Sequence, residues 1–220
     1  MDAPFWHDKW QRNQIAFHEA QVNPLLVAHF DSLHTSPAGR IFVPLCGKTR
    51  DIHWLLSHGL RVAGAELSEI AVEQLFAELG VKPHTTPLGK LTRYSAPDLD
   101  IYQGDIFDLS RDVLGDVDAI YDRAALIALP ELLRARYARH LAQITGRAQQ
   151  LLVCITYEQT LLAGPPFSVD GAEVALVYQG IYDLQSLGSS EISGGLKGKC
   201  AAMENVWLLR PSAQPGRPAG

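Results

Sequence analysis

The 220-residue sequence has few of the features that mark secreted or membrane proteins. Its three cysteines, Cys46, Cys154 and Cys200, are an odd number without a CxxC pair, which favours a reduced cytoplasmic compartment over a disulfide framework. The first residues carry charge where a secretory signal needs an apolar core, and no apolar run reaches the roughly 18 residues that span a bilayer. We therefore expect a cytoplasmic protein that does not interact with a membrane.

Positive charge is also scarce. The chain has 19 Lys and Arg against 24 Asp and Glu, a formal net charge of -5. Binding of duplex nucleic acid through its phosphates needs clustered basic residues, so we expect a small-molecule partner and no nucleic acid. Pairs among the eight histidines are five residues apart, a spacing that does not bring two rings to one helix face. We expect no metal site.

Short apolar runs alternate with amphipathic segments through the middle of the chain, which is typical of an α/β protein. The pattern predicts a mostly parallel sheet with helices on both faces. Expected strands are 40–45, 61–66, 99–105, 118–123 and 149–157. Expected crossover helices, bounded by cap residues and glycines, are 49–58, 68–79 and 130–144.

Ahead of the first strand the sequence predicts two further helices. One is expected over 4–19, and a second begins at Asn23, where an N-cap residue is followed by Pro24 at the first helical position. Together they form a helical cover over residues 1–38, which is an addition to a plain α/β unit.

The end of the chain has a different pattern. The apolar segments 181–192 and 203–211 follow one another across a Gly- and Lys-rich connection, which predicts a closing antiparallel hairpin. We expect a single domain over 1–211 and a mobile tail over 212–220, which has nothing to bury. The modest size and the lack of an evident apolar patch favour a monomer.

The first expected strand runs into PLCGKTRD, at the sheet edge where open α/β proteins bind ligands. A P-loop needs glycine where Phe42 stands, and a dinucleotide fingerprint needs three glycines where this turn has one. Both observations argue against a nucleotide triphosphatase and a nicotinamide enzyme. An adenosine ligand without phosphates needs only one close backbone approach, at Gly47.

Acidic residues end the next two expected strands. Glu66 lies 19 residues beyond Gly47, where such folds place a carboxylate on the ribose hydroxyls. The alternative is a solvated carboxylate ahead of a helix N-terminus. Asp105 and Ile106, in GDIFD, offer an acid and an apolar side chain for an adenine, although turns of Gly and Asp are common.

Arg123 ends the fourth expected strand in the segment YDR. Its guanidinium supplies fixed positive charge for an anionic group of a ligand. The alternative is a structural salt bridge with Asp122 or a glutamate. Trp6, Trp10 and Phe17 recur at helical spacing, and without further context a buried hydrophobic stripe explains them.

Five segments in this order, PLCGKTRD, AELS, GDIFDL, YDRAAL and GPPF, lie behind an aromatic N-terminal segment. With them the chain resembles the thiopurine S-methyltransferase family over nearly its whole length. The resemblance implies a seven-stranded, Rossmann-like sheet with an antiparallel last strand. It also implies S-adenosyl-L-methionine as cofactor and an aromatic or heteroaromatic thiol as acceptor.

The resemblance assigns site residues by their positions in these segments. They are Trp10, Leu45, Gly47, Glu66, Asp105, Ile106 and Arg123 for the cofactor, with Phe17, Arg123 and Phe167 for the acceptor. We expect in-line methyl transfer to a thiolate that Arg123, the catalytic residue, keeps ionised. Two alternatives remain: a non-catalytic S-adenosylmethionine-binding protein, and a nicotinamide oxidoreductase on a related fold. The sequence leaves thiols and selenium or tellurium species open as natural acceptors.

Overall fold

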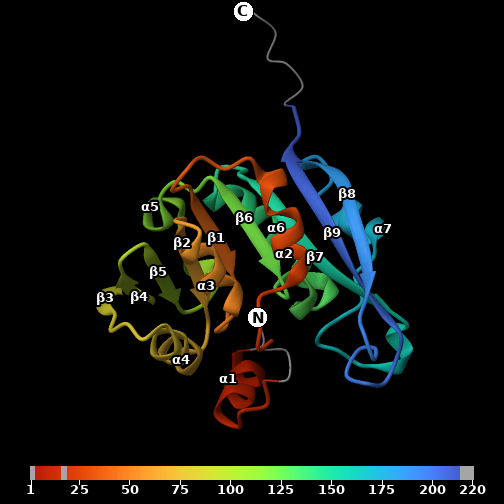
Figure 1. The fold of residues 1–220 in the computed structure, drawn as a ribbon, viewed down its shortest axis with the longest axis horizontal. Coiled ribbons are helices and arrows are strands. Elements are labelled where there is room, and N and C mark those ends of the chain that lie inside the picture. The colour runs from red at the N-terminus through yellow and green to blue at the C-terminus, as the bar shows by residue number, and fades with distance from the viewer. Residues whose placement is uncertain (1–2, 16–18, 214–220) are drawn as a thin grey trace, which may run out of the picture.

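The computed structural model describes residues 3–15 and 19–213, and within them it contains one nine-stranded sheet (Figure 1). The strand order is β3-β4-β5-β2-β1-β6-β7-β9-β8. The strands are β1 (Arg40–Pro44), β2 (Arg61–Glu66), β3 (His84–Leu88), β4 (Leu91–Ala96), β5 (Leu99–Gln103), β6 (Ala119–Arg123), β7 (Gln149–Tyr157), β8 (Tyr182–Glu191) and β9 (Ala202–Pro211).

The centre of the sheet is parallel, and its last strand is antiparallel. β5, β2, β1, β6 and β7 run parallel to one another, whereas β9 pairs antiparallel with both β7 and β8. These are the strands that the apolar runs predict, and β8 and β9 form the expected hairpin. The observed bounds differ from the expected ones by two residues at most. A mostly parallel α/β sheet and its antiparallel end are thus confirmed.

The expectation of seven strands is wrong, because a hairpin of β3 and β4 extends the sheet beyond β5. Its two strands join through the tight turn Gly89-Lys90. The sequence HTTPL of β3 is short, polar and largely exposed, and it contains Pro87, which is tolerated at a sheet edge. An edge strand with one solvated face lacks the apolar run that identifies a buried strand.

Helices flank the strands with the expected caps. Ser68 accepts a hydrogen bond from Ala71 N at the start of one helix, and Gly80 ends it with a left-handed φ of 69°. The helices are α1 (Ala3–Gln11), α2 (Pro24–His29), α3 (Arg50–Ser57), α4 (Glu69–Leu79), α5 (Arg111–Leu114), α6 (Glu131–Ile144) and α7 (Gly171–Val177), with short 3₁₀ turns η1 (Phe30–Leu33), η2 (Ile106–Asp108), η3 (Leu126–Ala128) and η4 (Gln159–Leu161).

The first helix is shorter than its sequence pattern predicts. α1 ends at Gln11 and not at Glu19, so the expected bound is wrong. Asn13 takes a left-handed φ of 52°, and its backbone N–H donates to Trp10 O, which closes the helix. Asparagine is one of the few residues that adopt this conformation readily at a helix end.

Each face of the sheet has its own hydrophobic core. α6 and α7 pack on one face, where Tyr137, Leu141 and Val174 are fully buried. α2, α3 and α4 pack on the other, where Leu26 and Leu55 are fully buried. In Figure 1, α2 and α3 lie in front of the sheet, α6 lies behind it, and α1 lies beyond the carboxyl ends of the parallel strands.

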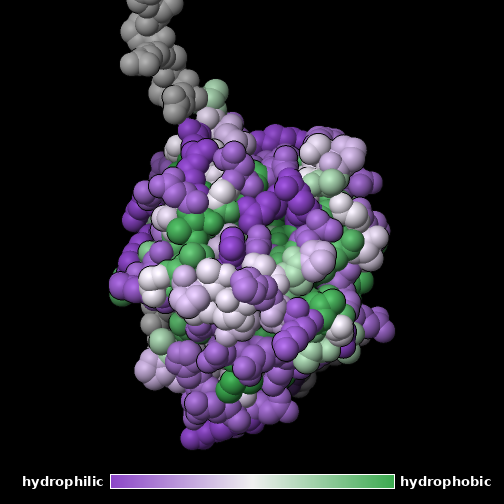
Figure 2. Space-filling model, turned by 90° about the vertical axis from the view of Figure 1, so that its left-hand side faces the viewer, coloured by the Kyte–Doolittle hydropathy of each residue, from purple (hydrophilic) through white to green (hydrophobic). Residues whose placement is uncertain are grey.

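The surface over the β3–β4 edge is mostly hydrophilic, with hydrophobic side chains in small separate patches (Figure 2). Among the described helices, none has the length and apolar character needed to cross a membrane.

Candidate active site

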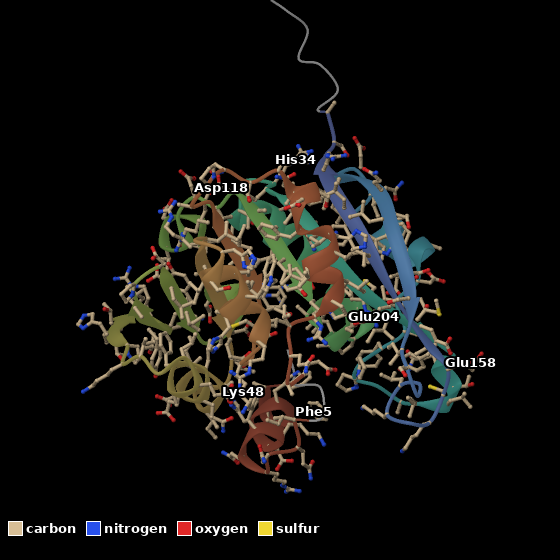
Figure 3. All side chains as sticks on the ribbon, in the orientation of Figure 1. Phe5, His34, Lys48, Asp118, Glu158 and Glu204 are labelled. Carbon is tan, nitrogen blue, oxygen red and sulfur yellow. The ribbon has the colours of Figure 1, made fainter. Side chains whose placement is uncertain are left out.

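A cavity of about 1240 Å³ opens at the carboxyl ends of the parallel strands. Its volume exceeds the roughly 300–1,000 Å³ of sites for drug-sized ligands, so it has room for two small molecules. Its walls come from α1 and the segment that follows, from the ends of β1, β2, β6 and β7, and from the β8–β9 loop. In Figure 3, Phe5 and Lys48 mark its α1 side and Glu204 its β9 side.

The turn after β1 is held in an unusual backbone conformation. Leu45 has a φ of 46° and Gly47 a φ of 52°, so two of three consecutive residues are left-handed. For a residue with a side chain this costs about 1–2 kcal/mol. Hydrogen bonds hold the turn: Cys46 N donates to Ala65 O over 3.0 Å, and Gly47 N donates to Glu66 Oε2 over 2.7 Å.

Glu66 is a buried carboxylate, only 6% exposed, which excludes the solvated alternative. One oxygen accepts from Gly47 N and the other from Ser68 N, both at 2.7 Å. Burial raises the pKa of Glu66, and these backbone N–H groups oppose the rise. A carboxylate oxygen has two lone pairs, so each of the two oxygens can still accept a hydrogen bond from a hydroxyl of a ligand in the cavity.

Trp10 closes the cavity over this turn. The side chain is 4% exposed, and a Cβ placed on Gly47 would lie 3.3 Å from its indole Cζ2. Glycine is therefore favoured twice at position 47, by its left-handed backbone and by the indole that packs on it.

Cys46 faces inward from the same turn. Burial, with Glu66 nearby, raises the pKa of its thiol well above the ordinary value. A neutral buried thiol packs as a small hydrophobe and is a poor nucleophile. The β2 residue beneath it is Gly64, where an added Cβ would lie 3.0 Å from Cys46 Sγ and 2.6 Å from Ile101 Cδ1.

Arg123 projects into the cavity from the end of β6, with a side chain that is 14% exposed. Its Nη2 lies 3.6 Å from Glu19 Oε1. Arg123 therefore forms a salt bridge with a glutamate, which the sequence offered as the alternative to a contact with a ligand. Asp122 is not its partner. That carboxylate accepts from Tyr137 Oη at 2.8 Å and Leu126 N at 3.2 Å, within the core that α6 covers.

A polar network that the sequence analysis missed surrounds Arg123. Asp51 is 1% exposed and accepts from Asn23 N at 2.8 Å and from Tyr121 Oη at 3.0 Å. Asn23 Nδ2 donates to Glu204 Oε1 over 3.3 Å. Asn23 was expected only as a helix cap, and nothing in the local sequence around Asp51 or Glu204 distinguishes them from surface acids.

The described part of the cavity lining holds five of the predicted site residues: Trp10, Leu45, Gly47, Glu66 and Arg123. Asp105, Ile106 and Phe167 lie outside that lining, and Phe17 lies outside the described residues.

Local contacts explain the positions of the three outside the lining. Asp105 caps the short turn η2 by accepting from Phe107 N at 3.0 Å, and the carbonyl of Ile106 is 2.7 Å from His140 Nε2. The ring of Phe167 lies under the guanidinium of Arg134, 5.4 Å from its centroid.

Solved structures with the same fold include several methyltransferases. One is 1,6-didemethyltoxoflavin-N1-methyltransferase from Burkholderia thailandensis, solved with bound 1,6-didemethyltoxoflavin and S-adenosylhomocysteine. It covers 94% of this chain and 87% of its own, with a TM-score of 0.64 at 12% identity. Magnesium protoporphyrin IX methyltransferase from Synechocystis, solved with S-adenosylhomocysteine, covers 96% of this chain and 100% of its own, with a TM-score of 0.62 at 15% identity. The fold is that of the Rossmann-like methyltransferases.

Sequence comparison identifies the family. The model of the thiopurine S-methyltransferase family matches residues 1–210. Thiopurine S-methyltransferase from Xanthobacter autotrophicus is 59% identical over 210 residues, 95% of this chain and 99% of that protein. The enzyme of that name from Gluconobacter oxydans is 49% identical over 210 residues, 96% of each chain.

The chain therefore belongs to the thiopurine S-methyltransferase family. It is a methyltransferase whose cofactor is S-adenosylmethionine. This rejects the two alternatives from the sequence, a nicotinamide oxidoreductase and a non-catalytic binding protein.

Proposed function

We propose that this methyltransferase transfers the methyl group to the sulfur of a small aromatic or heteroaromatic thiol such as a thiopurine. The observation that carries the proposal is one continuous cavity that joins the Glu66–Gly47 turn to Arg123. Relatives that are 59% and 49% identical carry the name thiopurine S-methyltransferase, which supports the same acceptor class here.

The Glu66 end of the cavity suits the cofactor. A buried carboxylate accepts the N–H of Gly47 in this turn, so that N–H is already engaged and is not turned to a phosphate. We assign Glu66 to the ribose hydroxyls, with Trp10, Leu45 and Gly47 around them. Asp105 and Ile106, which follow β5, the strand that pairs with β2, are the candidates for the adenine.

The Arg123 end suits a flat acceptor. Pro165 and Pro166 line it together with the apolar side chains of Ile127 and Ile155. Phe167 follows the two prolines, and its backbone N–H donates to Ile127 O over 2.7 Å, so it supports this wall from behind. We assign Phe17 to the acceptor side as well. These apolar side chains can bury the large apolar surface of an aromatic ring.

S-adenosylmethionine supplies a methyl group activated by its positive sulfonium. The chain's contribution is to align the two reactants and to exclude water, which can lower a barrier by roughly 7–11 kcal/mol. Trp10 covers the cavity and excludes water. Arg123 lies near the acceptor and favours its thiolate, because a neighbouring opposite charge lowers a pKa by about 1–3 units. The transfer is in line, and no covalent intermediate with the protein forms.

An acceptor screen with labelled methyl donor tests the proposal. Matched series of aromatic thiols, phenols and amines are offered to the protein, together with selenium and tellurium oxyanions. We expect label on the sulfur of the thiols. Methylation of oxygen or nitrogen acceptors alone, or of the chalcogen oxyanions alone, would overturn the assignment of the acceptor and leave the methyltransferase class intact.

A further inference from the structure

A second ionisable side chain, Glu204, faces Arg123 across the acceptor end of the cavity. Glu204 of β9 lies opposite Ile155 of β7, and Arg123 of β6 lies opposite Val153 of the same strand. Ile155 and Val153 are two residues apart, so their side chains leave the same face of the sheet. Arg123 and Glu204 therefore project from that face too, with one strand between them, and both line the cavity.

The carboxylate of Glu204 is held by a neutral donor. Asn23 Nδ2 donates to Glu204 Oε1 over 3.3 Å. The Asn23 amide is itself fixed, because its Oδ1 accepts from Leu25 N at 2.8 Å and caps α2. A neutral donor can remain bonded to this oxygen whether or not the carboxyl group carries a proton, whereas a salt bridge would resist protonation.

The surroundings of Glu204 weaken its hold on negative charge. Burial raises its pKa, and the carboxylates of Glu19 and Asp51 raise it further, while Arg123 and the Asn23 amide lower it, with a net upward shift. The phenol of Tyr121, from β6, also faces the group. A proton acceptor works best when its pKa approaches the working pH, and an ordinary exposed glutamate is too weak a base for a thiol.

We propose that Glu204 accepts the proton of the acceptor thiol, an inference that rests on the proposed S-methyltransferase function. The S–H bond breaks, and the proton moves to a Glu204 carboxylate oxygen, which leaves the electron pair on sulfur. That pair forms the new S–CH₃ bond, and the methyl–sulfonium bond breaks with its electrons kept by the cofactor sulfur. The proton leaves Glu204 for water when the products depart.

The charges around Arg123 support this role. Before the proton moves, the negative charge that Arg123 stabilises at longer range is the Glu204 carboxylate. Afterwards it is the thiolate, while Glu204 is neutral. The transfer relocates one negative charge inside the cavity and creates none, which matters where few water molecules screen charges. Without Glu204, ionising the thiol requires release of the proton to bulk solvent.

A series of aromatic thiols of graded pKa tests the role, with Glu204→Gln compared with the unaltered protein. The amide keeps the shape and an oxygen for Asn23 Nδ2. At pH 7, we expect kcat/KM to fall about 100-fold for thiols whose pKa exceeds about 8, the usual size of a lost general base. For thiols with a pKa below about 5, already ionised in solution, we expect a loss of less than about threefold.

A binding measurement without methyl donor gives a second readout. Aromatic thiolates absorb at longer wavelength than the thiols, so a spectrum of the bound acceptor reports its ionisation. In the unaltered protein, we expect the thiolate band to appear without release of a proton to the buffer. In Glu204→Gln, we expect either no thiolate band or the release of about one proton per thiolate formed.

Two further variants separate proton transfer from simple charge. Glu204→Asp keeps a carboxyl group and should recover part of the lost activity towards thiols of high pKa. Glu19→Gln removes the other carboxylate beside Arg123 and leaves Glu204 in place, so it should not reproduce the selective loss of activity towards thiols of high pKa that Glu204→Gln shows.

The outcomes are distinguishable. In Glu204→Gln, equal losses across the thiol series would overturn the role of Glu204. A thiolate band formed by this variant with no proton released would overturn it too. Failure of the unaltered protein to methylate any thiol in the series would instead overturn the proposed acceptor class.

Discussion

The cavity has a glutamate at each end, and the two are held in different ways. Glu66 is 6% exposed and accepts from two backbone N–H groups, those of Gly47 and Ser68. Glu204 is half-buried and held by a side-chain amide, beside Arg123. Burial raises the pKa of both. Backbone donors stabilise the charged form at a fixed place, which suits binding, whereas a side-chain environment allows the proton to come and go, which suits chemistry.

The largest expected effect concerns the charged end. Arg123→Ala should lower kcat/KM for aromatic thiols about 100-fold, because the loss of a neighbouring positive charge raises the thiol pKa by about 1–3 units. The dissociation constant of the cofactor should change far less. Steady-state kinetics and calorimetry measure the two quantities, and Arg123→Lys, which keeps the charge, is the control. Unchanged turnover would remove Arg123 from the reaction.

The backbone-held end should respond in binding. Glu66→Gln turns an NH₂ group towards Gly47 N or Ser68 N, so one buried donor loses its acceptor. We expect the dissociation constant of S-adenosylmethionine to rise about 30-fold, equivalent to about 2 kcal/mol. A calorimetric titration with no loss of affinity would show that this carboxylate does not hold the cofactor.

The same variant should change the pH dependence of stability. A raised pKa means that the folded chain holds the Glu66 proton more tightly than the unfolded chain does. The stabilising contribution is complete below the ordinary value of 4.5 and is lost as the pH rises from there through the raised pKa. Glu66→Gln should lack this decline in urea unfolding measured across that window. Parallel curves for the two proteins would contradict it.

A smaller effect is expected from packing beneath the turn after β1, which contains Cys46 and Gly47. Gly64→Ala places a Cβ 2.6 Å from Ile101 Cδ1 and 3.0 Å from Cys46 Sγ, so the free energy of unfolding should fall by about 1–2 kcal/mol. Urea unfolding measures it. The double variant with Ile101→Val lacks the Cδ1 atom and should regain part of the loss. No recovery would mean that Cys46 and its turn, and not Ile101, bear the strain.

The smallest effect is expected from the ion pair at the cavity mouth. Glu19 is 61% exposed and lies 3.6 Å from the Arg123 guanidinium, so Glu19→Gln should change the free energy of unfolding by less than about 0.5 kcal/mol. Thermal unfolding at low and high salt measures it. A larger, salt-insensitive loss would place Glu19 among the structural supports of Arg123.

The sequence predicts the positions of the strands best where the strands are buried on both faces. The runs of β1, β2, β6 and β7 are apolar because both of their faces are covered, so their bounds were found to within one residue. The β3–β4 hairpin was not predicted, because a strand at the edge of the sheet needs no such apolar run. The end of α1 depended on Asn13, whose left-handed φ of 52° overrides the helical spacing of the aromatic residues.

Some residues of the site were likewise predictable from the sequence and others were not. Gly47 and Glu66 were predictable because strand ends in a parallel sheet meet at one edge. Asn23, Asp51 and Glu204 were not, because they come together only when β9 returns antiparallel beside β7 and the N-terminal segment lies across it. Their partners are far away in the sequence, so no local spacing marks them.

The added hairpin also determines how the sheet ends. Without residues 84–96, β5 would be the outermost strand, with the buried side chains of Ile101 and Tyr102 beside open backbone groups. Such an edge invites pairing with a second copy of the chain. β3 instead presents polar side chains and Pro87, which lacks the N–H that a foreign strand would need. The hairpin thus acts as a guard against self-association, and a chain without it should aggregate.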